Sequence, residues 1–490
     1  MIPELPWAGP RRQVRARGGG AAGPPPASLL GRDASTDHGA RCIRVMTALE
    51  TNRMSAMGRR VRCFLLACSW QSSGVLVGGL NVPDGAPFPS WPGYQGWFRA
   101  PNDTAGLGWI HWSRDRSMIT PSTLSFDVWP DMAEYRTAYP ATGFTLPNGT
   151  TATLFSSADA TTVDVHFRWL KEHNIGGVWH QRFLVGLKGG TGALPSFNTT
   201  EDVRHHIMEA SVKHSRGFAM AYDTAGMPEA DIFKVLTEDW VTLEAEGLPT
   251  HPQYLRYGGK PVVVVEGFYP GVGQHDPITA QTGRSLVSFL RGRGVFVVGL
   301  GTWTWRTLEQ QYSEDWKQLF RSFDAYVPWN IGNWLPNATT GEKEANTQYW
   351  EEDAAEMARH GVLYVPSVYP GFSWSHLDRE NCSAQALLPR YNGRFYWRQW
   401  YAASRLNLSS VYVAMFDEVD EGTAVFKIAD TAAVPTQSCF VGDKGCPSDW
   451  YLTLTTLGTA QLHTPNGRRR ATDDAVVASP DTIPVKPLPC

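Results

Sequence analysis

The sequence lacks an excess of positive charge, a metal-type cysteine spacing and a long apolar segment. Its 44 Lys and Arg residues are spread along most of the chain and leave a formal net charge of -3, so the basic footprint of a nucleic-acid-binding protein is missing. The seven cysteines contain no C-x-x-C pair, which argues against a zinc site. The apolar run after Arg62 is about eight residues long, whereas a transmembrane helix needs roughly 20, so we expect no stable membrane span.

Six N-x-S/T sequons favour passage through the secretory route, at Asn102, Asn148, Asn198, Asn337, Asn381 and Asn407. In an oxidising compartment Cys439 and Cys446 could close a small disulfide loop, although spacing alone does not establish the pairing. We therefore expect a protein that is secreted or resides in the lumen of the secretory pathway.

The two ends of the chain differ in composition from the middle. Residues 1–74 are expected to be a disordered extension, since the Arg, Gly and Pro-rich part has no periodic apolar face. Within it, residues 57–73 combine a basic start, a short apolar core and small polar residues, as in a signal peptide, so either Met57 is the true start or the segment is an internal anchor. Residues 466–490 are expected to be a disordered tail, which leaves residues 75–465 as the folded domain.

From about residue 160 onward, short apolar or β-branched runs alternate with longer segments of helical period. Seven strands are predicted, at 176–183, 217–223, 261–267, 295–301, 324–329, 362–368 and 410–416. Helices are predicted at 163–173, 201–215, 228–246, 279–292, 307–321, 343–359 and 388–406.

An eighth strand within 74–98 would complete an α/β fold of the (β/α)8 TIM barrel type, with residues 99–160 as a long excursion after the first strand. The alternative is a doubly wound open sheet. That fold usually carries a glycine-rich phosphate turn after its first strand, and no such motif follows the strand candidates of this chain. The barrel is therefore the favoured prediction.

The stretch VAMFDEVDEGT, residues 413–423, ends an apolar strand with two glutamates, Glu418 and Glu421. Two carboxyl groups close together do not both ionise easily, so one holds a proton while the other stays anionic, which separates an acid from a base. Glycoside hydrolysis uses such a pair. The alternative is that the acidic residues form a solvated loop.

Barrel active sites gather at the carboxyl ends of the strands, so the residues that follow each strand are the candidates. The predicted substrate-binding set is Gln181, Arg182, Tyr222, Asp223, Glu266, Trp303, Tyr326, Trp329, Asn330, Tyr369 and Asp417. A mouth of carboxylates, tyrosines and tryptophans, without a cysteine or histidine cluster or a phosphate cradle, suits a neutral polyhydroxylated ligand. We therefore expect an oligosaccharide or polysaccharide as the partner, with no metal and no cofactor.

Several motifs carry a resemblance to a known family. The ending E-x-x-E-G-T, at residues 418–423, resembles the strand-8 motif of the glycoside hydrolase family 99 endo-α-mannosidases, which overlap family 71 in fold. The segments 93–98, 163–183, 258–268 and 447–452 are similar to segments of family-99-like barrel proteins, and the resemblance covers about residues 90–460. The family has Trp-Asn between its two glutamates, whereas this chain has Val419 and Asp420.

The resemblance implies a retaining reaction at an α-glycosidic bond. It assigns Glu418 as the base on the sugar 2-hydroxyl and Glu421 as the acid/base, so that the sugar's own 2-oxygen displaces the leaving group. The sequence thus predicts a monomeric glycoside hydrolase for α-linked glycans such as α-mannan, with Glu418 and Glu421 as the catalytic pair. A non-catalytic carbohydrate-binding barrel and an α-1,3-glucanase-like hydrolase stay open as alternatives.

Overall fold

The computed structural model describes residues 80–191, 194–270, 278–378, 387–406 and 408–462, together with 479–481 and 483. The predicted extension 1–74 with its leader-like segment 57–73 lies outside these residues, as does nearly all of the tail 466–490. Within the described part, no helix has the length and apolar character needed to cross a bilayer.

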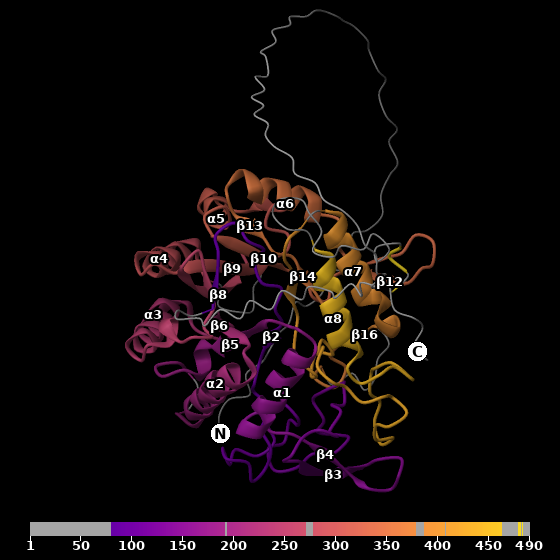
Figure 1. Ribbon diagram of the computed structural model, residues 1–490. Helices are drawn as coiled ribbons and strands as arrows, with labels where there is room; N and C mark the ends of the chain where they lie inside the picture. The colour runs from indigo at the N-terminus through magenta and orange to yellow at the C-terminus, as the bar shows by residue number, and fades with distance from the viewer. Residues whose placement is uncertain are drawn as a thin grey trace, which may run out of the picture. The chain divides into compact units, whose positions relative to one another are not determined.

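Seven parallel strands form the main sheet in the order β13, β10, β9, β8, β6, β5 and β2 (Figure 1). Their bounds are β2 Gly93–Tyr94, β5 Gly177–Phe183, β6 Gly217–Asp223, β8 Lys260–Phe268, β9 Phe296–Thr302, β10 Ala325–Trp329 and β13 Leu363–Tyr364. Most of these residues are buried on both faces, which explains why the strands are continuous apolar runs and do not alternate. The short β1 (Asn81–Val82) and β7 (Arg256–Tyr257) pair beside β8.

Two further short strands close the sheet into a barrel. Chain 362–368 forms β13 and then β14 (Ser367–Val368), and β14 pairs in parallel with β17 (Tyr412–Val413). A parallel bridge joins Val413 to Pro92 beside β2, supported by the hydrogen bond from Val413 N to Trp91 O at 3.1 Å. Counting β13 and β14 as one position gives eight strand positions, so the chain folds as the predicted (β/α)8 barrel, and its first strand lies in the 93–98 region.

The crossover helices follow the predicted order between the strands. They are α1 Ala160–Glu172, α2 Leu194–His214, α3 Glu229–Ala245, α4 Ala280–Gly292, α5 Glu314–Phe320, α6 Trp350–Arg359 and α7 Arg394–Arg405. An additional helix, α8 (Trp450–Gln461), packs on α7 and was not predicted because its residues are apolar without a helical stripe.

Three helices are shorter than predicted because local structure replaces their first turns. Residues 309–311 form a separate 3-10 turn before α5. Lys343–Ala345 forms β12, which pairs with β11 (Trp334–Pro336) in a hairpin before α6. Leu387–Leu388 forms β16 against β15 (Phe372–Ser373), and Gly393, at a φ of 89°, ends the turn that precedes α7.

The long excursion after β2 covers the side of the barrel near α1. It carries the antiparallel hairpin β3 (Tyr139–Thr145) and β4 (Thr151–Leu154) within the predicted excursion 99–160. Trp112, Phe126 and Phe155 form its aromatic core. Its Asp127 N donates to Val419 O at 3.0 Å, so the excursion holds the acidic segment after β17 in place.

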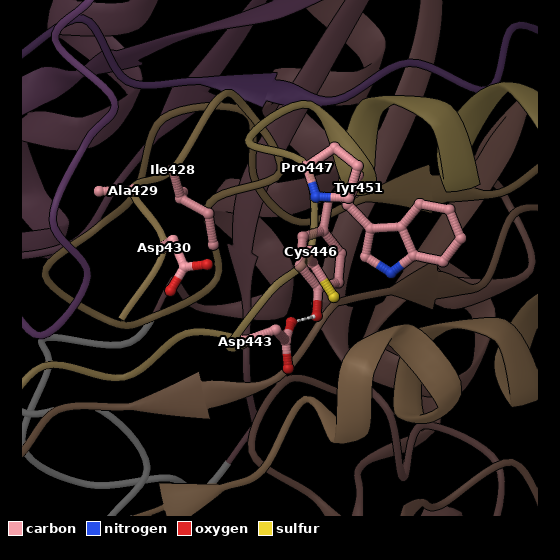
Figure 2. A pocket seen from close by; sticks show the side chains of 8 residues that line it. Ile428, Ala429, Asp430, Asp443, Cys446, Pro447 and Tyr451 are labelled. Carbon is pink, nitrogen blue, oxygen red and sulfur yellow. Dashed lines mark hydrogen bonds between the residues drawn. The ribbon is translucent and has the colours of Figure 1, made fainter. Parts of the chain in front are cut away.

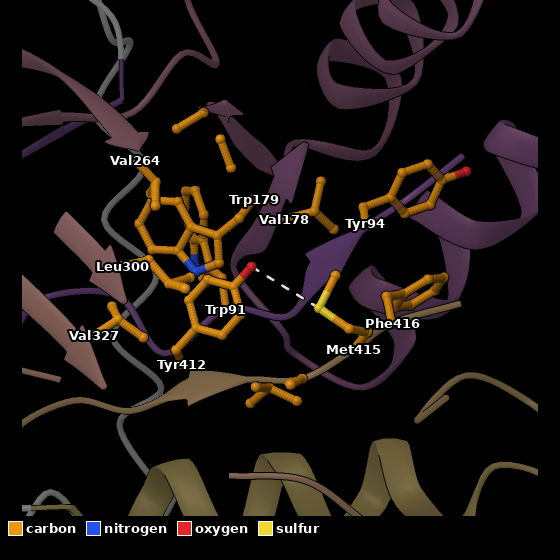
Figure 3. Close-up of a cluster of buried hydrophobic side chains, with 14 of the residues drawn as sticks. Trp91, Tyr94, Val178, Trp179, Val264, Leu300, Val327, Tyr412, Met415 and Phe416 are labelled. Atoms are coloured by element: carbon orange, nitrogen blue, oxygen red, sulfur yellow. Dashed lines mark hydrogen bonds between the residues drawn. The ribbon is translucent and has the colours of Figure 1, made fainter. Parts of the chain in front are cut away.

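Aromatic and aliphatic side chains fill the barrel interior (Figure 3). The rings of Trp91 and Trp179 lie 5.3 Å apart, and Trp179 stacks on Tyr412 at 6.3 Å. At Gly93 a Cβ atom would lie 2.2 Å from Met415 and 2.6 Å from the Tyr412 hydroxyl, so only glycine fits this tightly packed layer. The interior is a packed core, and polar chemistry is left to the carboxyl ends of the strands.

Candidate active site

The acidic segment that follows β17 is buried although it carries four carboxyl groups. Asp417, Glu418, Asp420 and Glu421 are each at most 5% exposed. The structure therefore contradicts the alternative prediction that these residues form a solvated acidic loop. Burial of this many carboxyl groups favours their protonated forms and raises their pKa values.

Asp417 joins the last strand to the first. Its two carboxylate oxygens accept hydrogen bonds from Gln95 N at 2.8 Å and Gly96 N at 2.9 Å. Burial raises the pKa of Asp417 to about 7, against the lowering effect of these two amides. Asp417 was predicted to contact substrate. Its carboxylate is instead fully buried and accepts hydrogen bonds from the backbone, so Asp417 positions the chain after the first strand.

Glu418 is held by two hydrogen bonds. Gln95 Nε2 donates to its Oε1 at 2.9 Å, and Thr423 Oγ1 donates to its Oε2 at 2.9 Å. Burial and then the nearby Asp420 charge raise the pKa of Glu418 to about 8, while both donors lower it. These donors stabilise the ionised carboxylate and fix its orientation.

Glu421 lies in the same group, but its carboxylate accepts no hydrogen bond from the residues that the structure describes. Its main-chain oxygen accepts one from Ser373 N at 2.7 Å, which anchors the backbone. Burial raises the pKa of Glu421 well above the ordinary value, and the charges of Glu418, Asp420 and Glu266 raise it further. Glu421 is therefore the member of the pair that holds a proton more readily.

Glu266 at the end of β8 faces this pair from another part of the barrel rim. Gln181 Nε2 and the Tyr269 hydroxyl each donate to its carboxylate at 3.2 Å. Asp223 is its register partner on β6, and burial together with the Asp223 and Glu418 charges raises the pKa of Glu266. Strands β5, β6 and β8 thus bring Gln181, Asp223 and Glu266 to the same site as Glu418 and Glu421.

Two residues of this site, Gln95 and Tyr412, were missed in the sequence. Gln95 lies in the motif after the first strand, but no sequence signal indicates that it contacts Glu418. Tyr412 lies inside an apolar strand, where burial raises its pKa and the charges of Glu266, Glu418 and Asp223 raise it further. Tyr269, by contrast, closely follows the predicted strand 261–267, so its place at a strand end does identify it as a candidate.

Trp329 and Trp303 lie on the rim. The Trp329 ring meets the Tyr412 ring edge-on at 6.1 Å, and it is partly exposed at the end of β10. Trp303 is also partly exposed and stacks on Tyr349 at 5.4 Å. Both rings therefore present an accessible surface, Trp329 next to the tyrosine that borders the carboxylates.

Arg182 and Tyr222 are not in the site. Both side chains point into the layer between the sheet and the helices, where Arg182 Nε and the Tyr222 hydroxyl donate to Asp239 Oδ2 at 2.8 and 2.7 Å. Arg182 also pairs with Glu201. The reason is the strand pleat, since Arg182 follows Gln181 directly and successive side chains face opposite sides.

The same pleat removes Tyr326 and Tyr369 from the site. Tyr326 is fully buried, donates to Thr302 O at 2.9 Å and packs against Phe320 and Phe323 outside the barrel interior. Tyr369 is fully buried and its hydroxyl donates to Asn333 O at 2.9 Å. Both were predicted to contact substrate, and the structure places them in the outer packing layer.

Asn330 holds the loop after β10. Its Nδ2 donates to Asn346 O at 2.7 Å and its backbone N donates to Ser367 Oγ at 3.0 Å. Its side chain is buried, so it positions the loop that follows Trp329.

The excursion after β2 supplies one more neighbour of the acidic group. His111 Nδ1 lies 3.1 Å from Asp420 Oδ2, and its ring stacks on Trp97 at 3.8 Å. Burial raises the pKa of Asp420 to about 8, and burial together with Arg99 lowers the pKa of His111. The contact is therefore best described as a hydrogen bond between a carboxyl group and a neutral imidazole.

Two cavities lie in the carboxyl-terminal part of the domain, and one of them reaches the acidic segment. One of about 350 Å³ is bordered by Gly422, the neighbour of Glu421, and its other lining residues include Phe372, Leu388, Arg390 and Phe440. The other, of about 10 Å³, lies under Cys446 and the Asp443–Tyr451 hydrogen bond and is large enough for about one water molecule (Figure 2). Neither cavity is lined by Glu418 or Glu421 themselves.

Among the described residues no group of His, Cys, Asp and Glu has the geometry of a metal site. The acidic group instead offers one hydrogen-bonded carboxylate and one that tends to hold a proton, next to accessible aromatic rings. That arrangement can remove a proton from one atom of a ligand and deliver a proton to another.

No protein-family model matches the sequence, and neither does any curated protein sequence. Solved structures do resemble it. A GH99 endo-α-mannosidase from Bacteroides thetaiotaomicron in complex with bis-tris-propane is 17% identical, with a TM-score of 0.53 over 77% of this chain and 97% of that one. A second structure of the GH99 endo-α-mannosidase from this bacterium gives 16%, a TM-score of 0.52, and 75% and 95% coverage. The chain therefore has the (β/α)8 barrel fold seen in GH99 endo-α-mannosidase structures.

Proposed function

We propose that this protein is a glycoside hydrolase that cleaves α-linked glycans, with Glu418 and Glu421 as its catalytic pair. The observation that carries the proposal is the unequal environment of these two carboxyl groups. Glu418 accepts hydrogen bonds from Gln95 and Thr423 at 2.9 Å, whereas Glu421 is buried beside three other acidic groups and tends to hold its proton. One base and one acid at the carboxyl end of a barrel strand suit glycosidic cleavage.

The proposed reaction has two steps and retains the α configuration. Glu418 removes the proton of the sugar 2-hydroxyl, the 2-oxygen attacks the anomeric carbon, and the leaving glycosidic oxygen takes a proton from Glu421. In the second step Glu421 takes a proton from water, the water oxygen attacks the anomeric carbon, and the 2-oxygen leaves with a proton from Glu418. No protein nucleophile is needed, and protons balance over the cycle.

We propose an α-mannosidic substrate such as α-mannan, because two solved structures that share this fold are of endo-α-mannosidases. Gln181, Asp223 and Glu266 would contact sugar hydroxyls, and Trp329 would stack on a sugar face. A secreted or lumenal location and a monomeric state are part of the proposal. The location is supported by the disulfide bonds at Cys439 and Cys446 and by exposed sequon positions Asn148 and Asn198.

The test uses the full chain expressed through a secretory host, with Glu418→Gln, Glu421→Gln and, as a matched control, Glu351→Gln on the exposed face of α6. Each protein is incubated with α-mannan, α-1,3-glucan and high-mannose oligosaccharides, and the anomers of the products are read by NMR. We expect products with the α configuration from the wild type and the control. In both site variants we expect the rate of cleavage to fall at least about 10³-fold.

The outcomes separate the alternatives. Cleavage of α-1,3-glucan alone would replace the mannosidic substrate by a glucan. Saturable binding without cleavage would overturn the catalytic assignment in favour of a carbohydrate-binding barrel. Products of inverted configuration would contradict the two-step scheme.

A further inference from the structure

A second constellation of side chains lies behind the acidic segment, made by Asp127, His376 and Ser438. His376 Nδ1 hydrogen-bonds to Asp127 Oδ1, and His376 Nε2 lies 2.8 Å from Ser438 Oγ. The three residues come from the excursion after β2, from the segment after β15 and from the segment before α8. None of them has a place in the proposed glycosidase reaction.

The Asp127 carboxylate is fully engaged. It accepts hydrogen bonds from Ser375 N at 2.6 Å, from His376 N at 3.0 Å, from Ser373 Oγ and from His376 Nδ1. The side chains of Asp127 and His376 are only 2% and 3% exposed. A buried carboxylate with four donors holds the imidazole ring in one orientation.

This arrangement determines which nitrogen of His376 carries the proton. An ionised carboxylate can only accept, so Nδ1 bears the hydrogen that points at Asp127. In the neutral ring Nε2 is then the acceptor, and the hydrogen bond at 2.8 Å runs from the Ser438 hydroxyl to Nε2. This is the tautomer that a general base needs in order to take a serine proton.

Ser438 is accessible and firmly placed. It is partly exposed, unlike the two residues behind it. It directly precedes Cys439, which is disulfide-bonded, so a covalent bond restrains the backbone next to the hydroxyl. An accessible hydroxyl, a base in contact with it and a buried carboxylate that orients the base are the three parts of a nucleophilic serine site.

We propose that Ser438, His376 and Asp127 form a serine hydrolase site for short acyl esters. Ser438 Oγ attacks the ester carbonyl while its proton passes to His376 Nε2, and the alcohol leaves with that proton to give an acyl-serine. Water then attacks the acyl carbonyl, gives a proton to Nε2, and releases the carboxylic acid as Ser438 Oγ regains the proton. Asp127 positions the ring and stabilises its protonated form.

The placement of the triad indicates the class of ester. Ser373, which donates to Asp127, also donates from its backbone N to Glu421 O at 2.7 Å. The Phe440 ring lies 6.0 Å from the His376 ring and borders the cavity of about 350 Å³ that reaches Gly422. The ester is therefore assigned as an O-acetyl or similar acyl group on a carbohydrate, a choice of substrate that rests on the proposed glycosidase function. The assignment of the hydrolytic triad itself does not rest on the glycosidase function.

The first experiment is covalent trapping on the full chain. A fluorophosphonate probe reacts with an activated serine by forming a P–Oγ bond, breaking the P–F bond and releasing fluoride. We expect one adduct per chain, located at Ser438 by peptide mass spectrometry, absent from Ser438→Ala and retained in Ser322→Ala, a half-buried serine beside α5 that serves as the matched control.

The second experiment measures turnover of p-nitrophenyl acetate and release of acetate from O-acetylated mannan. Ser438→Ala is expected to lower ester turnover at least about a hundredfold and His376→Gln similarly, while α-glycan cleavage by Ser438→Ala stays within about twofold of the wild type. A wild type that gives neither an adduct nor ester turnover above the buffer rate would overturn the triad. Turnover of the nitrophenyl ester without release of acetate from O-acetylated mannan would overturn only the assignment of a carbohydrate ester as the substrate. Glycan cleavage is scored separately, so failure of the glycosidase proposal is distinguishable from failure of this one.

Discussion

Gln95 Nε2 donates to Glu418 Oε1 at 2.9 Å, and this hydrogen bond joins the first strand position of the barrel to the last. The adjacent backbone amides of Gln95 and Gly96 hold Asp417 in the same way. Closure of the barrel therefore has a direct chemical consequence, because the residue that orients the proposed base lies 323 positions away from it in the chain.

Replacing Gln95 by Ala is expected to raise the pKa of Glu418, because one donor to the ionised carboxylate is lost. The acid limb of the pH profile of kcat/KM should move to higher pH by about half a unit to one unit, and its maximum should fall about tenfold. Gln311→Ala, in the exposed turn before α5, is the control. An unchanged acid limb would show that Glu418 is not the base that titrates.

Trp329→Ala should weaken substrate binding more than chemistry. We expect KM to rise about tenfold, which corresponds to about 1.4 kcal/mol, while kcat changes less than threefold. Trp334 on β11 is 42% exposed and serves as a matched tryptophan, for which alanine should leave KM unchanged. Equal effects of the two substitutions on KM would remove Trp329 from the substrate site. Initial rates over a range of glycan concentrations provide the measurement.

Arg390 supports the acidic segment from behind. Its Nη2 donates to Gly422 O at 2.9 Å and to Ala424 O at 2.8 Å, and its side chain is buried against the Tyr451 ring. Arg390→Met should lower the free energy of unfolding by about 3 kcal/mol, since two buried carbonyls lose a charged donor.

The control for Arg390 is Arg291→Met, which removes a surface ion pair with Asp324 and should cost less than about 1 kcal/mol. Urea unfolding followed by circular dichroism compares the two variants. A loss for Arg390→Met no larger than that for Arg291→Met would contradict a supporting role.

Stability should fall as pH rises above neutrality. Asp417, Glu418 and Asp420 have pKa values raised to about 7, 8 and 8, so the folded state holds protons that the unfolded chain has already released. Their contribution is complete below the unfolded pKa values near 4 and is lost as pH rises through 7 to 8. We expect the urea midpoint to decrease between pH 6.5 and 8.5, and less so in Glu418→Gln.

Below pH 6.5 the buried histidines act in the opposite direction. Burial lowers the pKa values of His166 and His180 to about 3, so the unfolded chain takes up protons that the folded chain does not, and acid weakens the fold. Between about pH 4 and 6.5 the two effects oppose each other, so the urea midpoint should change less per pH unit there than between pH 6.5 and 8. A midpoint that stays flat or rises from pH 6.5 to 8.5 would contradict the raised carboxyl pKa values.

The alternation of strands and helices and the position of the acidic segment follow from local sequence patterns. Buried parallel strands are continuous apolar runs with polar residues at their ends. This local pattern identifies Glu418, Glu421, Glu266 and Gln181 as candidate site residues. It also favoured a barrel over an open sheet.

Which side chains at the strand ends face one another depends on contacts between segments that are distant in the sequence. Arg182 and Gln181 are neighbours in sequence, yet the pleat sends one into the helix layer and the other to Glu266, and a shift of one residue would exchange them. Gln95 meets Glu418 only because the barrel closes. Three separate segments pack behind the acidic segment and bring together Asp127, His376 and Ser438, although Asp127 and His376 are 249 residues apart. A local sequence pattern contains no information about such contacts between distant segments.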